Sequence, residues 1–373
     1  MEKRIIAHLD MDAFFASLEE VATPGFLGKP IVVGSDPKDG KGRGVVSTAN
    51  YKAREYGIHS ALPISTAWKL SQKAKQEGKL EVIFLPVDFK LYERVSGEIL
   101  SIVKQHSSLV EQASIDEFYF DLSSFKTFKK AKAICLAIKE EIREKEKVTC
   151  SIGIGPNKLI SKIAANVNKP DGILIIEERE VRKFLNPLPI KKIPGIGLKT
   201  NQLLNQKGIV LIRDLSKFTK KEMEAMLGKS GIKIYHSAKG IDNTPVTEFH
   251  EVKSISEQTT FDENTLNAAL IMDAFSTLSK NVFNTFIKSD FSKFKTITVT
   301  IRFSDFQTKT SSKSLKEGIS KKEQKRFNLE ILKLVLPFLD KRSNPKEKLI
   351  RLIGVRIASL IWVLTELFIC GIR

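Results

Sequence analysis

The sequence is poor in cysteine and in long apolar runs, and each shortage excludes a class of protein. Its three cysteines, Cys135, Cys150 and Cys370, are widely spaced and odd in number. They form no metal motif and indicate a reducing compartment. No stretch has the length and apolarity of a membrane-spanning helix. His8 and Asp10 interrupt the apolar start, which is unlike a signal peptide. We therefore expect a cytoplasmic protein that does not enter a membrane.

The charge balance points to a polyanionic partner. Lysine and arginine number 61 against 43 aspartate and glutamate, which gives a formal net charge of +18. An excess of this size favours a polyanion first and an anionic membrane surface second. A chain of 373 residues, with 42% hydrophobic and 28% charged residues, is typical of a globular protein of two to four domains.

Two short apolar segments carry carboxylates. The strand expected over 5–10 (IIAHLD) finishes at Asp10, and the strand expected over 113–122 (ASIDEFYFDL) contains Asp116 and Glu117. Adjacent side chains of an ideal strand point to opposite faces, so both acids reach one point only if the strand bends or ends there. Half-buried carboxylates need a compensating cation, and hard oxygen ligands favour Mg²⁺ or Mn²⁺. Solvated acids at strand ends are the alternative for either site alone.

A helix is expected over 47–56 (STANYKAREY), after a loop dense in glycine and cations. Thr48, Tyr51 and Arg54 are spaced three apart and would share one helical face. A hydroxyl, a phenol and a guanidinium beside a helix N-terminus make a phosphate-binding face. A capping threonine, a half-buried tyrosine and a solvated arginine explain the spacing equally well, so both interpretations stay open at this point.

Residues 177–241 contain a candidate phosphate-binding hairpin. Short helices surround IPGIG at 193–197, in which a hydrophobic residue precedes a Gly-x-Gly turn and a helix containing Lys199. In a helix-hairpin-helix of this kind, the backbone amides at Gly195 and Gly197 bind a nucleic-acid phosphate without reading sequence. A tight turn between two helices is the alternative. The charge of +18 favours the phosphate.

The rest of the chain mixes helices and strands. Their alternation up to about residue 176 indicates an α/β or α+β fold with the acids on a central sheet. Residues 242–252 are predicted to be a linker. Residues 253–358 predict a small sheet covered on one face by two helices, with a basic loop between a strand at 295–303 and a helix at 326–338. Cations recur on this segment and favour a surface that tracks a DNA backbone. The candidate DNA-binding cations there include Lys293, Lys295 and Arg302.

Four motifs together resemble the Y family of DNA polymerases, and within it the DinB or DNA polymerase IV branch. They are DMDAFFA at 10–16, STANYKAR at 47–54, SIDE at 114–117 and NKPDG at 168–172, in the family's order and spacing. The resemblance covers about residues 1–358.

The resemblance implies an α+β fold of the right-hand polymerase type. The implied boundaries are palm 1–11 and 79–176, fingers 12–78, thumb 177–241, linker 242–252 and little finger 253–358. The tail at 359–373 is apolar and lacks the glutamine of the family's clamp-binding peptides. A sliding clamp therefore stays an open partner, and a monomer is expected.

The resemblance also implies roles for individual residues. Asp10, Asp116 and Glu117 match the catalytic, metal-binding carboxylates, and the carbonyl of Met11 completes one metal shell. Two Mg²⁺ ions per site are implied, with Mn²⁺ as a substitute. Phe15 matches the steric gate that leaves no room for a 2′-hydroxyl. The residues implied at the nucleotide are Phe14, whose ring is expected in the core, Phe15, Thr48, Tyr51, Arg54 and Lys169.

The implied activity is template-directed, error-prone DNA synthesis in translesion synthesis and repair, without a proofreading exonuclease. Its partners are primer–template DNA and dNTPs, and the protein is expected at the nucleoid when it is on DNA. One rival is a glycosyltransferase with residues 10–12 as a DxD metal site, which leaves Asp116, Glu117 and the charge unexplained. A catalytically silent DNA-binding scaffold is the other rival, and retention of all three carboxylates argues against it.

Overall fold

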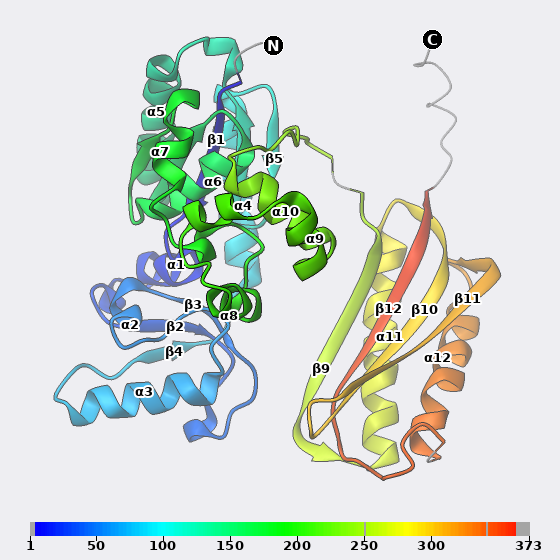
Figure 1. Cartoon of the computed structure of the whole chain (residues 1–373). Coiled ribbons are helices and arrows are strands. Elements are labelled where there is room, and N and C mark those ends of the chain that lie inside the picture. The colour runs from blue at the N-terminus through cyan, green and yellow to red at the C-terminus, as the bar shows by residue number, and fades with distance from the viewer. Residues whose placement is uncertain (1–3, 250, 341, 363–373) are drawn as a thin grey trace. The chain divides into compact units, whose positions relative to one another are not determined.

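The structure is a computed structural model that describes residues 4–249, 251–340 and 342–362 (Figure 1). The chain forms two compact units, Met1–Phe249 and His250–Arg373. Both units combine helices with sheets, which confirms the predicted α+β class. Among the described residues, none of the helices is long and apolar enough to cross a membrane.

The first unit is built around a five-stranded sheet in the order β5-β6-β1-β7-β8. The strands are β1 (Ile6–Met11), β5 (Val110–Gln112), β6 (Glu117–Asp121), β7 (Cys150–Gly155) and β8 (Ile173–Ile175). The central strand β1 is buried along its whole length and pairs antiparallel with both β6 and β7. The segment predicted as one strand over 113–122 enters the sheet only at Glu117, because a turn precedes it.

Three helices pack on this sheet: α4 (Phe89–His106), α5 (Phe128–Glu146) and α6 (Lys158–Val167). Helix α5 forms because Thr127 caps its N-terminus and apolar residues recur at helical spacing on its buried side. Alternate side chains of β1 separate two environments. Ala7, Leu9 and Met11 join the main apolar core, so His8 and Asp10 lie on the opposite face of the sheet.

A smaller sheet, β3-β2-β4, carries the predicted phosphate-binding residues. Its strands are β2 (Ile31–Gly34), β3 (Val46–Ala49) and β4 (Ile83–Leu85), and the nearby helices are α1 (Phe14–Ala22), α2 (Tyr51–Arg54) and α3 (Ile64–Gln76). The prediction of a helix over 47–56 was wrong: residues 46–49 are strand, and the helix begins at Tyr51. Asn50 sets this boundary, since its side-chain oxygen accepts hydrogen bonds from the amides of Ile31 and Ala53.

The last part of the first unit is helical and has its own apolar core. Its helices are α7 (Val181–Leu185), α8 (Leu198–Gln206), α9 (Lys220–Leu227) and α10 (Lys229–Ala238). The turn before α8 needs a glycine, because Gly195 has a φ of +92°.

The second unit is a four-stranded antiparallel sheet in the order β11-β10-β12-β9. Its elements are β9 (Ser254–Thr265), α11 (Ala268–Lys288), β10 (Phe291–Phe303), β11 (Thr308–Ser320), α12 (Gln324–Leu339) and β12 (Ile350–Trp362). Both helices cover one face of the sheet, as predicted (Figure 1). Phenylalanines such as Phe283, Phe294 and Phe327 fill the core between them and the sheet.

Two predictions for this unit were wrong at their boundaries. The basic loop expected between 303 and 326 contains β11, a long edge strand. Most of its residues are exposed, so the apolar alternation that signals a strand is missing. The apolar tail expected from Ser359 starts later, because β12 continues to Trp362. The remainder of that tail, including the LTELF segment at 364–368 considered as a clamp peptide, lies outside the described residues.

Candidate active site

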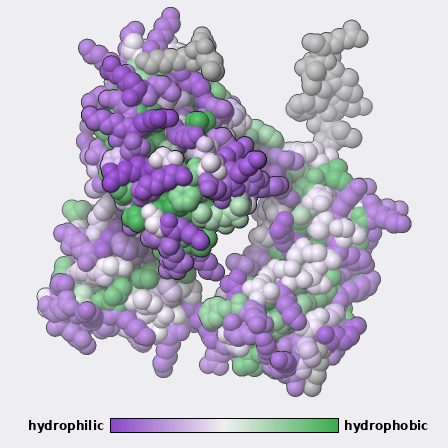
Figure 2. All heavy atoms as spheres, viewed as in Figure 1, coloured by the Kyte–Doolittle hydropathy of each residue, from purple (hydrophilic) through white to green (hydrophobic). Residues whose placement is uncertain are grey.

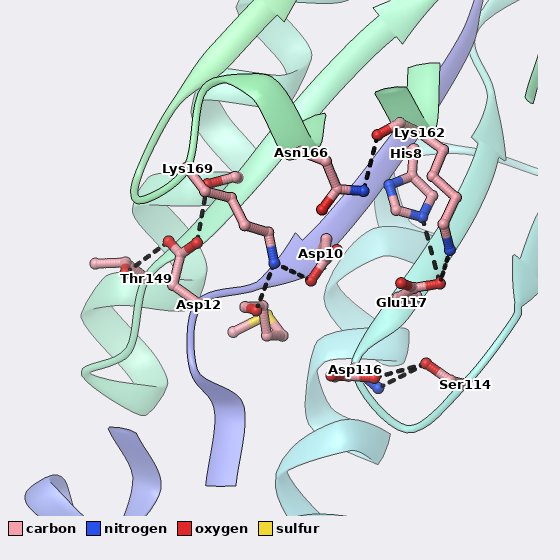
Figure 3. Close-up of polar contacts among 12 residues, drawn as sticks. His8, Asp10, Asp12, Ser114, Asp116, Glu117, Thr149, Lys162, Asn166 and Lys169 are labelled. Atoms are coloured by element: carbon pink, nitrogen blue, oxygen red, sulfur yellow. Dashed lines mark hydrogen bonds and ion pairs between the residues drawn. The ribbon is translucent and has the colours of Figure 1, made fainter. Parts of the chain in front are cut away.

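Two antiparallel neighbours, β1 and β6, bring the predicted carboxylates together. Asp10 lies directly opposite Glu117 in the register of these strands, and the amide of Met11 donates to the carbonyl of Asp116 at 3.0 Å. Asp116 sits in the turn that precedes β6, and its carboxylate accepts a hydrogen bond from Ser114 Oγ at 2.6 Å (Figure 3). Strand β6 begins only at Glu117, so the strand predicted over 113–122 is interrupted at the acid pair, as the sequence analysis required for both acids to reach one point.

Lysine ammonium groups hold two of the three carboxylates. Lys169 Nζ donates to Asp10 Oδ1 and to the carbonyl oxygen of Met11, the latter at 3.2 Å. Lys162 Nζ contacts Glu117 Oε2 at 2.5 Å (Figure 3). Within the described residues, no three His, Cys, Asp or Glu side chains are gathered as a metal cluster. Asp10 and Glu117 are therefore adjacent but are compensated by different lysines.

Their neighbours make Asp10 and Glu117 electrostatically unlike one another, although both are substantially buried. Asp10 is 6% exposed, and desolvation raises its pKa to about 6 against the opposing pull of Lys169. Burial also acts to raise the pKa of Glu117, but the neighbouring His8 and Lys162 outweigh it and lower that pKa to about 2. His8 is fully buried beside the ring of Tyr119, and desolvation lowers its pKa.

The predicted gate residue is stacked on an aromatic partner that the sequence analysis missed. The ring of Phe15 lies parallel to that of Tyr92, with centroids 4.1 Å apart, and Tyr92 donates its hydroxyl to Glu19 at 2.6 Å. Phe14 is buried in the main core, as expected. Tyr92 lies on the amphipathic helix α4, 77 positions after Phe15 in the sequence. The helical spacing of its apolar neighbours therefore indicated only that Tyr92 packs in the core.

The predicted phosphate-binding residues come from two elements rather than one helical face. Thr48 lies on β3, whereas Tyr51 and Arg54 lie on α2. The guanidinium of Arg54 sits 4.6 Å from the centre of the Tyr51 ring, and its Nε donates to the carbonyl of Ala49 at 2.9 Å. Burial and the carboxylate of Asp12 raise the pKa of Tyr51 to about 12, so its phenol keeps its proton at neutral pH.

Asp12 is a second residue whose importance the sequence did not reveal. It is 2% exposed and accepts hydrogen bonds from side chains and a backbone amide that are far apart in the sequence. Its place in the DMD motif was visible, but its partners follow only from the fold.

The predicted DNA-binding residues are divided between the two units. In the first unit, a Cβ built at Gly195 or Gly197 meets no atom within 4 Å, and Gly197 begins α8 without a side-chain cap. In the second unit, Lys293, Lys295 and Arg302 lie on β10.

The open face of the second unit's sheet is lined with short hydroxyls, which lie in the pale patch of Figure 2. Thr298 Oγ1 and Ser312 Oγ lie 2.8 Å apart, and Thr296 Oγ1 lies 3.1 Å from Ser359 Oγ. Arg302 joins this face, where its Nε donates to Thr308 at 2.9 Å.

Three segments of the chain match known protein families. Residues 9–166 match the impB/mucB/samB family, and 252–365 match the C-terminal domain of the same family. Residues 191–242 match the thumb domain of DNA polymerase iota.

Curated relatives and solved structures agree with these matches. The chain is 42% identical to a DNA polymerase IV of Methanoculleus marisnigri, over 96% of this chain and 94% of the relative. It is 38% identical to a DNA polymerase IV of Clostridium perfringens, over 96% and 95%. A Y-family DNA polymerase chimera, Dbh-Dpo4(243-245)-Dbh, is similar with a TM-score of 0.82 and 31% identity, over 96% of this chain and all of that chain. An insertion ternary complex of Dbh DNA polymerase has a TM-score of 0.65 with the same identity and coverage.

Proposed function

The chain belongs to the Y family of DNA-directed DNA polymerases, and from this membership we propose that it adds dNTPs to a primer 3′-OH by template-directed, error-prone translesion synthesis. The observation that carries the proposal is the pairing of Asp10 with Glu117 across β1 and β6, next to Asp116. Adjacent strand ends thereby present three carboxylates on a rigid sheet.

The donor set fits a hard divalent cation. Asp10 Oδ1 and the carbonyl oxygen of Met11 already share one cationic group, the ammonium of Lys169, so their oxygens converge on a single positive charge. Oxygen donors of this kind suit Mg²⁺, with Mn²⁺ as a substitute. When bound, two such ions supply Lewis acidity to the primer hydroxyl and neutralise charge on the triphosphate. Asp10, Met11, Asp116 and Glu117 are the proposed ligands.

The remaining residues bind and select the nucleotide in this proposal. Lys169, Tyr51 and Arg54, with Thr48, offer cationic and hydroxyl donors to the triphosphate. Phe15 is the steric gate, and its parallel stacking on Tyr92 supports this role because it restricts where the ring can move. A ring held in this way excludes a ribose 2′-hydroxyl by shape.

The proposed domains follow the boundaries given by the resemblance: palm 1–11 and 79–176, fingers 12–78, thumb 177–241, linker 242–252 and little finger 253–358. The hairpin at Gly195 and Gly197, Lys199 and the cations on β10 are proposed to contact the DNA backbone. Both units match models of this family or of its polymerases. As the resemblance implies, we propose synthesis without proofreading, by a cytoplasmic monomer. A sliding clamp stays an open partner.

The first test is primer extension with dNTPs and Mg²⁺ on intact and lesion-bearing templates. Asp116→Asn keeps the side-chain shape but removes a carboxylate, so we expect extension to fall by a factor of about 10³ or more, since metal-held charge supplies several kcal/mol of the rate enhancement. Its affinity for primer–template DNA should stay near that of the wild type. Glu117→Gln is the companion variant, and Asp305→Asn, an exposed acid of the second unit, is the control.

Normal extension by Asp116→Asn would remove Asp116 from the site. DNA binding without extension by the wild type would favour the scaffold function instead.

A further inference from the structure

The carboxylate of Asp12, the first residue after β1, accepts four hydrogen bonds. Its Oδ1 accepts from Ser151 Oγ at 2.9 Å and from the Tyr51 hydroxyl at 3.4 Å. Its Oδ2 accepts from Thr149 Oγ1 at 2.9 Å (Figure 3) and from the backbone amide of Asp171 at 2.8 Å. Ser151 lies on strand β7 and Thr149 directly before it. Tyr51 lies on helix α2, and Asp171 lies in the turn before β8.

The arrangement separates Asp12 from Asp10, its neighbour in the same motif. An ionised carboxylate offers about four acceptor positions, and four donors already surround that of Asp12. No acceptor position is then left for a metal ion. Asp10, in contrast, has the ammonium group of Lys169 as its partner. The two acids of the motif therefore have different functions.

One arm of this network sets the position of Lys169. The amide of Asp171 is bonded to Asp12, and the carboxylate of Asp171 is held by Lys139 Nζ at 2.8 Å and Arg143 Nη2 at 2.6 Å. Lys139 is 8% exposed and also donates to the carbonyl of Cys150. The short turn that carries Lys169 is thus fixed through its backbone and through a side chain two residues away.

The other arm reaches Tyr51, on a helix of the smaller sheet. Tyr51 and Lys169 are 118 positions apart in the sequence, yet both depend on the carboxylate of Asp12. We propose that Asp12 is a positioning residue for the incoming nucleotide, acting through Lys169 and Tyr51 on the triphosphate. This inference rests on the proposed polymerase function and assigns Asp12 no direct contact with a metal or with the reacting atoms.

The test measures dNTP incorporation by Asp12→Asn under steady-state and single-turnover conditions. An asparagine side chain keeps one acceptor oxygen and presents its NH₂ group to the two donors of the other, so either the turn or the phenol loses its fixed position. We expect the KM for dNTP to rise about tenfold, the size expected for an unsatisfied buried donor. The value of kcat should stay within about threefold, and DNA affinity should not change.

A double-mutant cycle with Lys169→Ala separates positioning from general structural damage. If Asp12 acts through Lys169, Asp12→Asn should raise the KM much less in the Lys169→Ala background than in the wild type. Equal effects in both backgrounds would overturn the proposal. So would a loss of kcat at unchanged KM, since that result would place Asp12 in the chemical step.

A second variant keeps the test decisive if Asp12→Asn does not fold. Thr149→Val with Ser151→Ala keeps the carboxylate and removes two of its four donors, and we expect its KM for dNTP to rise by at least about threefold. An unchanged KM in this folded variant would overturn the proposal. Wild-type extension is measured in parallel, and its absence would overturn the proposed function and this inference with it. Wild-type extension with unaffected variants overturns the inference alone.

Discussion

Asp10 combines deep burial, an ion pair and a proposed role in catalysis. Its pKa of about 6 lies well above the ordinary value of 3.8, because desolvation outweighs the attraction of Lys169. A shift of this size corresponds to roughly 3 kcal/mol. The charged carboxylate therefore opposes folding at neutral pH, which is common where a site is kept for function rather than stability.

Asp10→Asn should therefore stabilise the metal-free protein while it abolishes extension. The acid has a raised pKa in the folded state, so its unfavourable contribution is fully present above pH 6 and disappears as the pH falls towards 3.8. At pH 7.5 in EDTA, we expect the free energy of unfolding of the variant to be roughly 1–3 kcal/mol higher than that of the wild type. This gain should shrink at pH 5.

Asp171→Asn serves as the control, because it should lower the free energy of unfolding where Asp10→Asn raises it. Burial acts to raise the pKa of Asp171, but Lys139 and Arg143 outweigh it, so the net shift is downward. Its stabilising contribution is present above the ordinary carboxyl pKa and is lost at lower pH. Urea unfolding of both variants at the two pH values measures the contrast. A destabilised Asp10→Asn at pH 7.5 would contradict the burial argument.

At the scale of elements, Asn50 decides where strand β3 ends and helix α2 begins. Its side chain accepts from the amides of Ile31 and Ala53 and donates to Glu20 at 2.6 Å and to the carbonyl of Lys29 at 2.7 Å. It thus joins the start of α2 to strand β2 and to helix α1 at once.

Asn50→Ala should lower the free energy of unfolding by about 2–4 kcal/mol, because it leaves buried donors and acceptors unsatisfied. Thr127→Ala removes a more exposed cap, at the start of α5, and should lower it by only about 1 kcal/mol. Denaturant unfolding with a common slope compares the two. Equal losses would mean that Asn50 acts only as a local helix cap.

Asn50 also explains what the sequence could and could not predict. The helix predicted over 326–338 was found as α12, within two residues at each end, because its apolar residues repeat at helical spacing. The boundary at Asn50 depends on partners 19 to 30 positions away, which no local pattern reveals. The edge strand β11 was missed because solvent faces most of it. In the candidate site, strand-end acids gave a signal for Asp10 and Glu117, whereas Asp12 and Tyr92 depend on distant donors and on packing.

The whole molecule carries a net charge of +18, and its proposed partner is a polyanion. Binding to primer–template DNA should therefore weaken steeply with salt. If Lys199, Lys293, Lys295 and Arg302 each contact one phosphate, log K should fall against log salt with a slope of about −3.6. Arg302→Gln should reduce the magnitude of this slope by about 0.9.

Lys333→Gln is the matched control, because Lys333 lies on α12 and pairs with Glu330 on the covered side of the sheet. Fluorescence anisotropy across a salt series measures DNA binding by the wild type, Arg302→Gln and Lys333→Gln. A flat response in the wild type would contradict the role of the cations. An equal change in both variants would show that only net charge matters.

The central strand also determines how the site can respond to a substrate. β1 is hydrogen-bonded on both sides up to Asp10, so its amides are expected to exchange with solvent only when much of the first unit unfolds. The ammonium groups that neutralise Asp10 and Glu117 sit at the ends of long lysine side chains, which reorient within picoseconds to nanoseconds where they reach solvent. We therefore expect the backbone of β1 to open slowly and the lysine side chains to reorient quickly. An arriving substrate should thus be met by rotation of these two lysine side chains rather than by rearrangement of β1.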